Sequence, residues 1–343
     1  MFAARSQNAA SRLIGALLAV AAILPGSAAE VEILRSTGGL AADVVGVFRE
    51  PIGCHRTPDG SYLVFDRAGH TVYRVPASGT EVTEIVRIGS ETGRIISPSA
   101  FVLAGERFIV ADSPRRRERV QIFRRDGTLL AGFSLAERAT PRITNGRLAL
   151  GGVGSIQWTG QAILMNQPET GGLMTEFTVR GHPYRTIGRL RDTGHEDDRD
   201  LHLALNSGLP LVDPTGGYYF VFHAGVPVFR KYDHEGRLLF ERHIEGRELD
   251  ATVQSLPTSW PRRTDESGHE VPLVPPTVRT AQVDPTGKLW ISLSVPYTYV
   301  YDRDGDKIRT IQFRGAGLIA PNSLSFESRN ALLVTPGGYR VSI

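Results

Sequence analysis

The feature that most constrains the fold of this chain is a unit of short strands and tight turns, which recurs from Pro51 to the C-terminus. Its clearest copy runs from Gly105 to Leu130. In that copy a short apolar run ends at Asp112, an arginine-rich loop follows, and a β-branched and aromatic run leads into the turn Arg125-Asp126-Gly127-Thr128. Short runs of this composition between glycine-containing turns are typical of antiparallel strands in a meander. The unit therefore predicts an all-β chain.

Six groups of such strands follow one another between Pro51 and Ile343, although the third and sixth groups are degraded copies. Four short antiparallel strands in meander order form one blade of a β-propeller. Abundant glycine and evenly spread proline fit many short strands joined by tight turns. We therefore predict a six-bladed β-propeller of four-stranded antiparallel blades, formed as a single domain by residues 30–343.

The sixth group is one strand short at the C-terminus. Near the other end, Glu32-Ile33-Leu34-Arg35 resembles Glu84-Ile85-Val86-Arg87, the predicted outer strand of the first blade. A propeller has to protect its first and last sheet edges, and a strand borrowed from the other terminus does so. We therefore expect Val31–Arg35 to pair with Tyr339–Val341, so that the N-terminal strand completes the last blade and closes the ring.

The shared pattern is a proline, a turn and a strand that ends in Asp, as at Asp66 and Asp112, and the second copy continues with Arg119-Val120-Gln121-Ile122-Phe123 and Asp126-Gly127. This pattern resembles NHL-repeat six-bladed β-propellers of the secreted bacterial type. The resemblance covers nearly all of the chain after residue 29, and the first, second, fourth and fifth groups carry it best. The Gly-His and Trp-Asp signature of WD40 repeats is absent. The resemblance implies an architecture and not a particular chemistry.

The N-terminal segment has the features of a secretory signal. Arg5 and Arg12 precede the apolar run Leu13–Leu24, and small residues follow up to Ala29. The apolar run is too short for a good membrane span. We therefore predict a signal peptide over residues 1–29 and a periplasmic or secreted protein that is not inserted in a membrane after cleavage. A retained N-terminal anchor is the alternative.

The charge balance argues against a nucleic-acid partner. Removing Arg5 and Arg12 with the signal lowers the formal net charge from +3 to +1, whereas polyanion-binding domains usually carry a clear positive surplus. The interleaved aromatic residues of a base-stacking platform are also missing. The single cysteine, Cys54, excludes an internal disulfide, so the core and ring closure have to stabilise the protein, which we expect to be a monomer.

A four-stranded meander places its loops on two opposite faces of the predicted ring. One of them, the short-turn face, carries tight turns such as Pro58-Asp59-Gly60 and Arg125-Asp126-Gly127, which we expect to be too short to hold a partner. The other, the insertion face, carries the long blade-to-blade loops Ser134–Leu150, Arg189–Leu209 and Glu245–Arg279. Long loops without secondary structure are usually functional or disordered. The insertion face is therefore the predicted binding surface, with residues 189–209 and 245–279 as its main insertions.

A dense cluster of arginines lies on the insertion face of the predicted second blade. Arg115, Arg116, Arg117 and Arg119 are suited to gripping carboxylate, phosphate or sulfate groups. We therefore predict that these four residues bind a ligand. The alternative is a solvated loop whose arginines pair with Glu118 and neighbouring acids.

Two histidines are further candidate binding residues. His223 takes the strand-end position that Asp66 and Asp112 hold in the first two blades, beside the expected channel mouth. His55 lies on the innermost predicted strand of the first blade, where its side chain can line the channel. The alternatives are a turn-capping role for His223 and a structurally satisfied side chain for His55.

The sequence contains no clear metal site or catalytic motif. The segment His195–Asp200, with His202, contains metal-ligand side chains, but a solvated polar loop has the same composition. Asp302–Asp306 fails the EF-hand spacing and matches a plain hairpin turn. No phosphate-binding glycine loop, nucleophile elbow or HExxH motif is present. We therefore predict no catalytic residue, no metal ligand and no cofactor.

The leading functional hypothesis is an exported binding or scaffold protein that holds a peptide, protein or glycan of the cell envelope. The alternative is a metal-dependent propeller enzyme. Six-bladed propellers similar to this one include lyases and lactonases, and the resemblance implies a divalent ion at the channel mouth. In this chain His55, His223 and Asn166 are the residues that would have to converge on such an ion.

Overall fold

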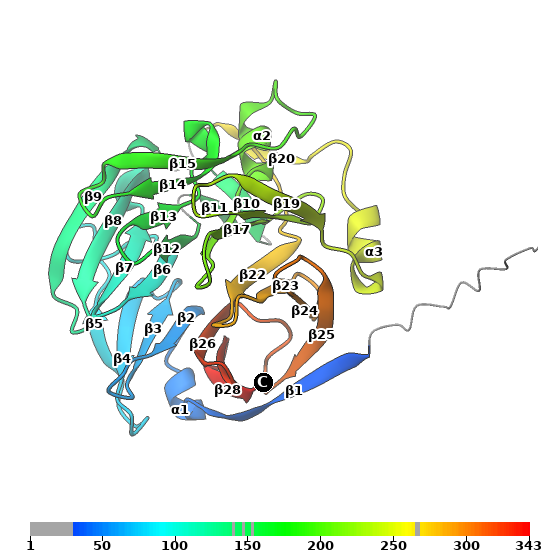
Figure 1. Ribbon diagram of the computed structural model, residues 1–343. Helices are drawn as coiled ribbons and strands as arrows, with labels where there is room; N and C mark the ends of the chain where they lie inside the picture. Colours follow the sequence, from blue (N-terminus) through cyan, green and yellow to red (C-terminus); the bar gives the residue numbers. More distant parts are fainter. Residues whose placement is uncertain (1–29, 139–140, 146–147, 152–153, 265–267) are drawn as a thin grey trace, which may run out of the picture.

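The computed structural model describes residues 30–138, 141–145, 148–151, 154–264 and 268–343. The predicted signal peptide, residues 1–29, lies outside these ranges and stays a prediction. Over the described ranges the chain is mostly β-strand, in a propeller-like arrangement (Figure 1). No helix in this part of the chain is both long and apolar enough to cross a membrane.

Four separate sheets contain four antiparallel strands each, in the order in which the strands follow in the chain. The first sheet contains β2 (Pro51–Arg56), β3 (Tyr62–Asp66), β4 (Thr71–Val75) and β5 (Thr83–Val86). The second contains β6 (Ala100–Ala104), β7 (Arg107–Asp112), β8 (Arg117–Arg124) and β9 (Leu129–Arg138). The third contains β12 (Ile156–Trp158), β13 (Ile163–Met165), β14 (Gly172–Phe177) and β15 (Pro183–Arg189). The fourth contains β16 (Gly208–Val212), β17 (Tyr218–Phe222), β18 (Val228–Tyr232) and β19 (Leu238–His243).

Eight further strands form one sheet in the order β22-β23-β24-β25-β1-β28-β27-β26. Its first half consists of β22 (Val278–Val283), β23 (Leu289–Leu293), β24 (Thr298–Tyr301) and β25 (Lys307–Arg314). Its second half consists of β26 (Ser323–Ser328), β27 (Ala331–Thr335) and β28 (Tyr339–Ser342). The N-terminal strand β1 (Val31–Gly39) joins the two halves, so the two ends of the chain meet in one sheet (Figure 1).

The pairing of β1 corrects the predicted register. Val31–Arg35 pairs in parallel with Thr310–Arg314 of β25, and not with β28. The later part of the strand, Ser36–Gly39, makes the antiparallel pairing with Tyr339–Val341. Glycine permits this close approach, because a Cβ added at Gly39 would overlap the backbone of β28. The prediction that the N-terminal strand pairs with Tyr339–Val341 was therefore correct, but the segment predicted to make this pairing was wrong.

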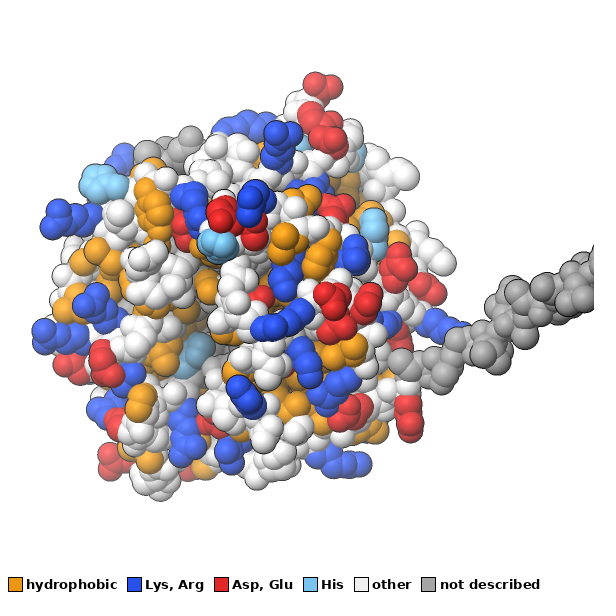
Figure 2. Space-filling view, viewed as in Figure 1, with side chains coloured by type: hydrophobic (Ala, Val, Ile, Leu, Met, Phe, Trp, Pro, Cys, Tyr) orange, Lys and Arg blue, Asp and Glu red, His pale blue; other side chains and the backbone are white. Residues whose placement is uncertain are grey.

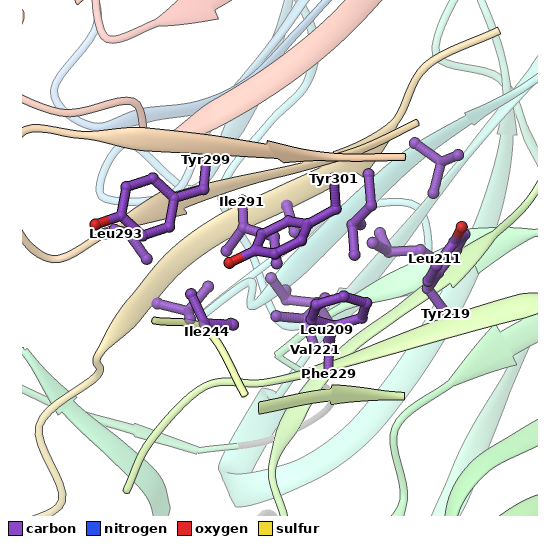
Figure 3. Packing of buried hydrophobic residues seen from close by; sticks show 14 of the residues in the cluster. Leu209, Leu211, Tyr219, Val221, Phe229, Ile244, Ile291, Leu293, Tyr299 and Tyr301 are labelled. Carbon is purple, nitrogen blue, oxygen red and sulfur yellow. The ribbon is translucent and has the colours of Figure 1, made fainter. Parts of the chain in front are cut away.

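Neighbouring sheets pack face to face through apolar side chains. The largest cluster fills the space between the fourth sheet and β22–β24, where Leu209 and Phe229 lie opposite Ile291 and Tyr301 (Figure 3). These side chains come from alternate positions along their strands, as expected for strands that are buried against another sheet. The first strands of the four smaller sheets and the two end strands of the eight-stranded sheet, β22 and β26, also contact one another in a closed circuit, β2–β6–β12–β16–β22–β26–β2.

Three connections between sheets contain secondary structure, which corrects the prediction of long structureless loops. A hairpin of β10 (Pro141–Asn145) and β11 (Leu148–Gly151) follows the second sheet, and α2 (Arg199–Leu205) follows the third. The connection after the fourth sheet contains α3 (Arg247–Gln254), β20 (Arg262–Thr264) and β21 (Glu270–Pro272). The short helix α1 (Ala42–Val45) and the 3₁₀ turns Pro114–Arg116 and Pro168–Thr170 complete the described elements.

Candidate functional site

The three insertions form one packed cap on the insertion face. Helix α2 contacts β10 of the preceding insertion and β21 of the following one, and Figure 1 shows α2, β10 and β20 on the same side of the molecule. An apolar cluster fixes α2 in place; it consists of Leu201, Ala204, Leu205, Ala224 and Val274, with Trp260 packed against it. The N-terminus of α2 is capped by Asp198, whose Oδ1 accepts a hydrogen bond from the backbone N–H of Leu201 at 3.3 Å. The cap is therefore an ordered surface that apolar packing and helix capping hold in place.

Arg191 attaches this cap to the fourth sheet. Its guanidinium lies 4.3 Å from the ring centre of Phe222 and donates hydrogen bonds to the carbonyl oxygens of Leu205 (2.7 Å), Ala224 (2.6 Å) and Val226 (3.0 Å). Burial, and after it the charge of Arg230, lowers the pKa of Arg191 to about 10. The residue stays cationic at neutral pH and acts as a structural clamp. Sequence inspection missed this residue, because its partners are carbonyl groups of distant segments.

The structure separates the four arginines that were predicted as one binding cluster. The guanidinium of Arg119 makes a bidentate pair with the carboxylate of Asp112, at 2.9 Å from Nε to Oδ1 and 2.6 Å from Nη2 to Oδ2. It also donates to the carbonyl oxygens of Ser90 and Arg94, both at 3.0 Å. Because Asp112 is fully buried, this pair serves the fold and anchors the connection from the first sheet. Arg119 is thus engaged by the protein itself.

Arg115, Arg116 and Arg117 are instead exposed at the tip of the loop between β7 and β8. Arg115 and Arg116 both adopt left-handed backbone conformations, with φ of 54° and 64°. Non-glycine residues in this region cost on the order of 1 kcal/mol each. Within the described chain, the guanidinium groups of Arg115 and Arg117 make no hydrogen bond or ion pair. This loop tip therefore presents two cations that are available to a partner.

His223 and His55 each have a protein partner. The Nδ1 of His223 lies 2.9 Å from the carbonyl oxygen of Val278, so it carries the proton and bridges the fourth sheet to β22. Burial lowers the pKa of His223, and the bond to Val278 opposes this shift. The Nδ1 of His55 lies 2.9 Å from Ser325 Oγ, across the contact between β2 and β26. Burial lowers the pKa of His55 to about 4. Both side chains are neutral at pH 7.

The strand-end aspartate that His223 replaces has a structural role in the first sheet. Asp66 accepts hydrogen bonds from the backbone N–H groups of Arg49 (2.8 Å) and Glu50 (2.7 Å), which lie in the segment entering that sheet. His223 also joins its strand end to a neighbouring connection, since its backbone oxygen accepts hydrogen bonds from Thr277 N and Val278 N. The strand-end position therefore joins sheets to their connections.

The groups considered for a metal are held by hydrogen bonds and ion pairs with other parts of the protein. Asn166 donates from Nδ2 to the carbonyl oxygen of Leu173 at 2.7 Å, and its Oδ1 accepts from Gly208 N at 3.1 Å. In the His195–Asp200 segment, Asp198 pairs with Arg262, and His202 Nδ1 lies 2.8 Å from Thr193 Oγ1. In the part of the chain that the structure describes, no group of three or more His, Cys, Asp or Glu side chains is placed to hold a metal ion.

The short-turn face is not featureless, although its turns are short. A groove of about 610 Å³ lies there between the first two sheets, and it is lined by charged side chains of the β2–β3, β6–β7 and β8–β9 turns. Elsewhere the surface is mixed: Figure 2 shows basic and acidic side chains interspersed over the viewed face. The sequence motifs did not indicate the groove, because its lining comes from turns of two different sheets.

Comparison with known proteins identifies the fold and no closer relationship. No protein-family model and no curated protein matches the chain. Among solved structures, a gluconolactonase from Xanthomonas campestris is similar with a TM-score of 0.53 at 15% identity, and the match covers 92% of this chain and 96% of that one. The PQQ-bound aldose sugar dehydrogenase of Streptomyces coelicolor has a TM-score of 0.53 at 11% identity, covering 90% and 96%. A streptogramin B lyase has a TM-score of 0.52 at 10% identity, covering 84% and 76%. These neighbours are propeller proteins, and at such identities the likeness shows the fold alone.

Proposed function

We propose that this protein is an exported binding module that holds a peptide, protein or glycan of the cell envelope on its insertion face. The observation that carries the proposal is the cap, in which insertions from three separate connections pack on one another around α2. Loops held by a rigid scaffold are the usual place for binding residues. An inter-sheet connection needs only a few residues, so three structured insertions on one face are best explained by a surface that serves a partner.

The architecture that we propose beneath this surface is a six-bladed propeller of the NHL-like type. The eight-stranded sheet then corresponds to two blades that share β1. The closed circuit of six first strands, from β2 to β26 and back, supports this interpretation. We further propose that residues 1–29 are a cleaved signal, that the protein is periplasmic or secreted, and that it acts as a monomer without cofactor or metal.

The loop tip of Arg115 and Arg117 is the proposed charged contact of the insertion face. By strand order, the loop between β7 and β8 opens on the same face as the connections between sheets. Two exposed guanidiniums that have no partner among the described residues can bind carboxylate, phosphate or sulfate groups. A partner with acidic groups on a peptide or glycan would fit this contact.

Site-specific photo-crosslinking in cells tests the proposal without knowledge of the partner. A photoreactive residue is placed at Arg115 or Arg263 on the insertion face, and at Asp126 or Glu235 on the short-turn face as matched exposed controls. We expect the same crosslinked partner from both insertion-face positions and none from the controls. Replacing Arg115 and Arg117 together by serine should reduce the crosslink from Arg263. Equal adducts from both faces, or none from any position, would contradict the proposal.

A further inference from the structure

The groove on the short-turn face holds an unusual arrangement of charge. Its guanidinium groups belong to Arg74, Arg107, Arg124 and Arg125, and its carboxylate groups belong to Asp59, Glu106 and Asp126. Arg74 pairs with Asp59 at 2.7 Å, and Arg125 pairs with Glu106 at 3.2 Å. Arg107 and Arg124 are different. Within the described residues, neither of their guanidiniums makes a hydrogen bond or lies within 4.0 Å of a carboxylate oxygen.

Arg107 and Arg124 face each other across two strands. They are direct partners in the register of β7 and β8, so their side chains leave the same face of the sheet. Directly opposite residues have Cβ atoms about 4.5–5.5 Å apart, and like charges at that separation are destabilising. Both residues are exposed and line the groove. The arrangement therefore places two positive charges together on one wall, and within the described residues neither guanidinium makes an ion pair, although the charge of Arg124 acts on the nearby Asp126.

Two other sheets contain an aspartate at the position of Arg124, whereas the same turn of the third sheet begins with Thr178. The β8–β9 turn has two backbone hydrogen bonds, from Arg124 N to Thr128 O and from Gly127 N to Arg124 O. The β18–β19 and β24–β25 turns have the same pair of bonds, and their first residues are Asp233 and Asp302. The carboxylates of both aspartates cap their own turns by accepting backbone N–H groups. Of these three turns, only the β8–β9 turn of the second sheet has an arginine in place of the capping aspartate.

In the second sheet the capping is done by another residue. Asp126 Oδ1 accepts a hydrogen bond from Thr128 N at 2.8 Å, so the turn is preserved although Arg124 begins it. This bond, together with other contacts of Thr128 and the charge of Arg124, lowers the pKa of Asp126. The turn also rests on the first sheet, because a Cβ added at Gly127, which has a φ of +90°, would overlap the carbonyl oxygen of Ile85. The backbone of Arg124 is thus held in the turn beside the groove, and within the described residues its guanidinium makes no hydrogen bond to that turn.

We propose that Arg107 and Arg124 form a binding site for a phosphate group, either inorganic phosphate or a phosphomonoester of a small polar molecule. Arginine matches the geometry of phosphate oxygens and binds them through paired hydrogen bonds. A phosphomonoester carries a charge of about −1.5 to −2 at pH 7, so one group balances both guanidiniums. The groove, at about 610 Å³, has the volume of a small-molecule site. This site lies on the face opposite to the proposed partner surface and is independent of it.

The test measures binding of inorganic phosphate to the full chain by calorimetry and by thermal shift, with acetate at matched ionic strength as the second anion. We expect phosphate to bind and to raise the melting temperature more than acetate does. The double variant Arg107→Gln and Arg124→Gln should weaken phosphate binding on the order of tenfold or more. Arg237→Gln, an exposed arginine on the equivalent β18–β19 turn, is the matched control and should keep the wild-type response.

A second variant keeps the test decisive if the double variant folds poorly. Arg124→Asp restores the residue of the other two turns and places a carboxylate opposite Arg107. It should melt at a higher temperature than the wild type in low-salt buffer without phosphate, and it should no longer respond to phosphate. An unchanged phosphate response in both variants would overturn the site. An equal response of the wild type to acetate and phosphate would overturn the ligand class. Neither result would change the crosslinks expected on the insertion face.

Discussion

Replacing Leu34 by alanine is expected to destabilise the protein, because this side chain fixes β1 between the two halves of the eight-stranded sheet. Leu34 is only 7% exposed and packs in a cluster with Ile311, Phe313 and Val341. The cluster contains residues of β25 on one side and β28 on the other. The neighbouring Ile33 is 43% exposed on the opposite face of the same strand and provides a matched control.

The expected magnitude follows from the burial of the two side chains. Leucine-to-alanine substitutions in cores cost about 2–5 kcal/mol, from lost transfer free energy and the cavity that remains. Because Leu34 lies near an edge of the molecule, where neighbours can partly close the cavity, we expect about 2–3 kcal/mol. A chain of this length loses roughly 1.5 °C of melting temperature per kcal/mol, so the shift should be about 4 °C. Ile33→Ala should cost less than about 1 kcal/mol.

Urea unfolding followed by tryptophan fluorescence measures the free energy of unfolding of both variants, and Trp290 belongs to the same cluster as Leu34. Thermal unfolding gives an independent order of stability. The reasoning would be refuted if Ile33→Ala and Leu34→Ala cost the same amount. In that case β1 would be held by backbone pairing alone, without the one-sided packing that the structure shows.

Three further predictions concern buried polar groups. Asp112→Ala should lower the free energy of unfolding in urea by about 3 kcal/mol, because it leaves Arg119 without its carboxylate partner. Arg117→Ala should leave that free energy nearly unchanged. Equal losses in the two variants would contradict the different roles of Arg119 and Arg117. The pKa of His55, lowered to about 4, lies below the unfolded value of about 6.5, so the folded state binds fewer protons between these values. Stability should therefore fall by up to about 3 kcal/mol as the pH drops from 6.5 to 4, and His55→Gln should reduce this loss; an identical pH profile would contradict the shift. Burial raises the pKa of Cys54 to about 12, so iodoacetamide at pH 8 should label the unfolded protein and leave the folded protein unmodified, as mass spectrometry would show.

The strands were predictable because their signals are local. The apolar runs Tyr218–Phe222 and Leu289–Leu293 form β17 and β23. Their apolar runs are bounded by Asp-Pro-Thr-Gly turns, and Asp213 and Asp284 cap those turns in the same way, with Oδ1 accepting the backbone N–H two residues later at 2.8 Å. A turn and a strand need only neighbouring residues to define them.

For the candidate sites, the sequence predicted only which types of residue lie on the insertion face, and not which of them contact one another. The arginine loop was identified correctly as an exposed feature, but its division into the paired Arg119 and the exposed Arg115 and Arg117 depends on the position of Asp112 across the hairpin. The cap was missed for a similar reason. Helix α2 is only seven residues long, and its apolar side chains acquire partners from the β17–β18 loop and from the insertion after the fourth sheet only when the chain has folded.

The sequence by itself determined the repeated strands, the turns and the use of an N-terminal strand at the last sheet edge, since alternation and turn chemistry act over a few residues. Only the tertiary structure decided which part of β1 pairs with which neighbour, because the approach of Gly39 to β28 and the burial of Leu34 depend on both ends of the chain. It also decided which charges are satisfied. Arg107 and Arg124 are ordinary residues in the sequence, and they become a site because the register of two strands places them opposite each other beside a groove.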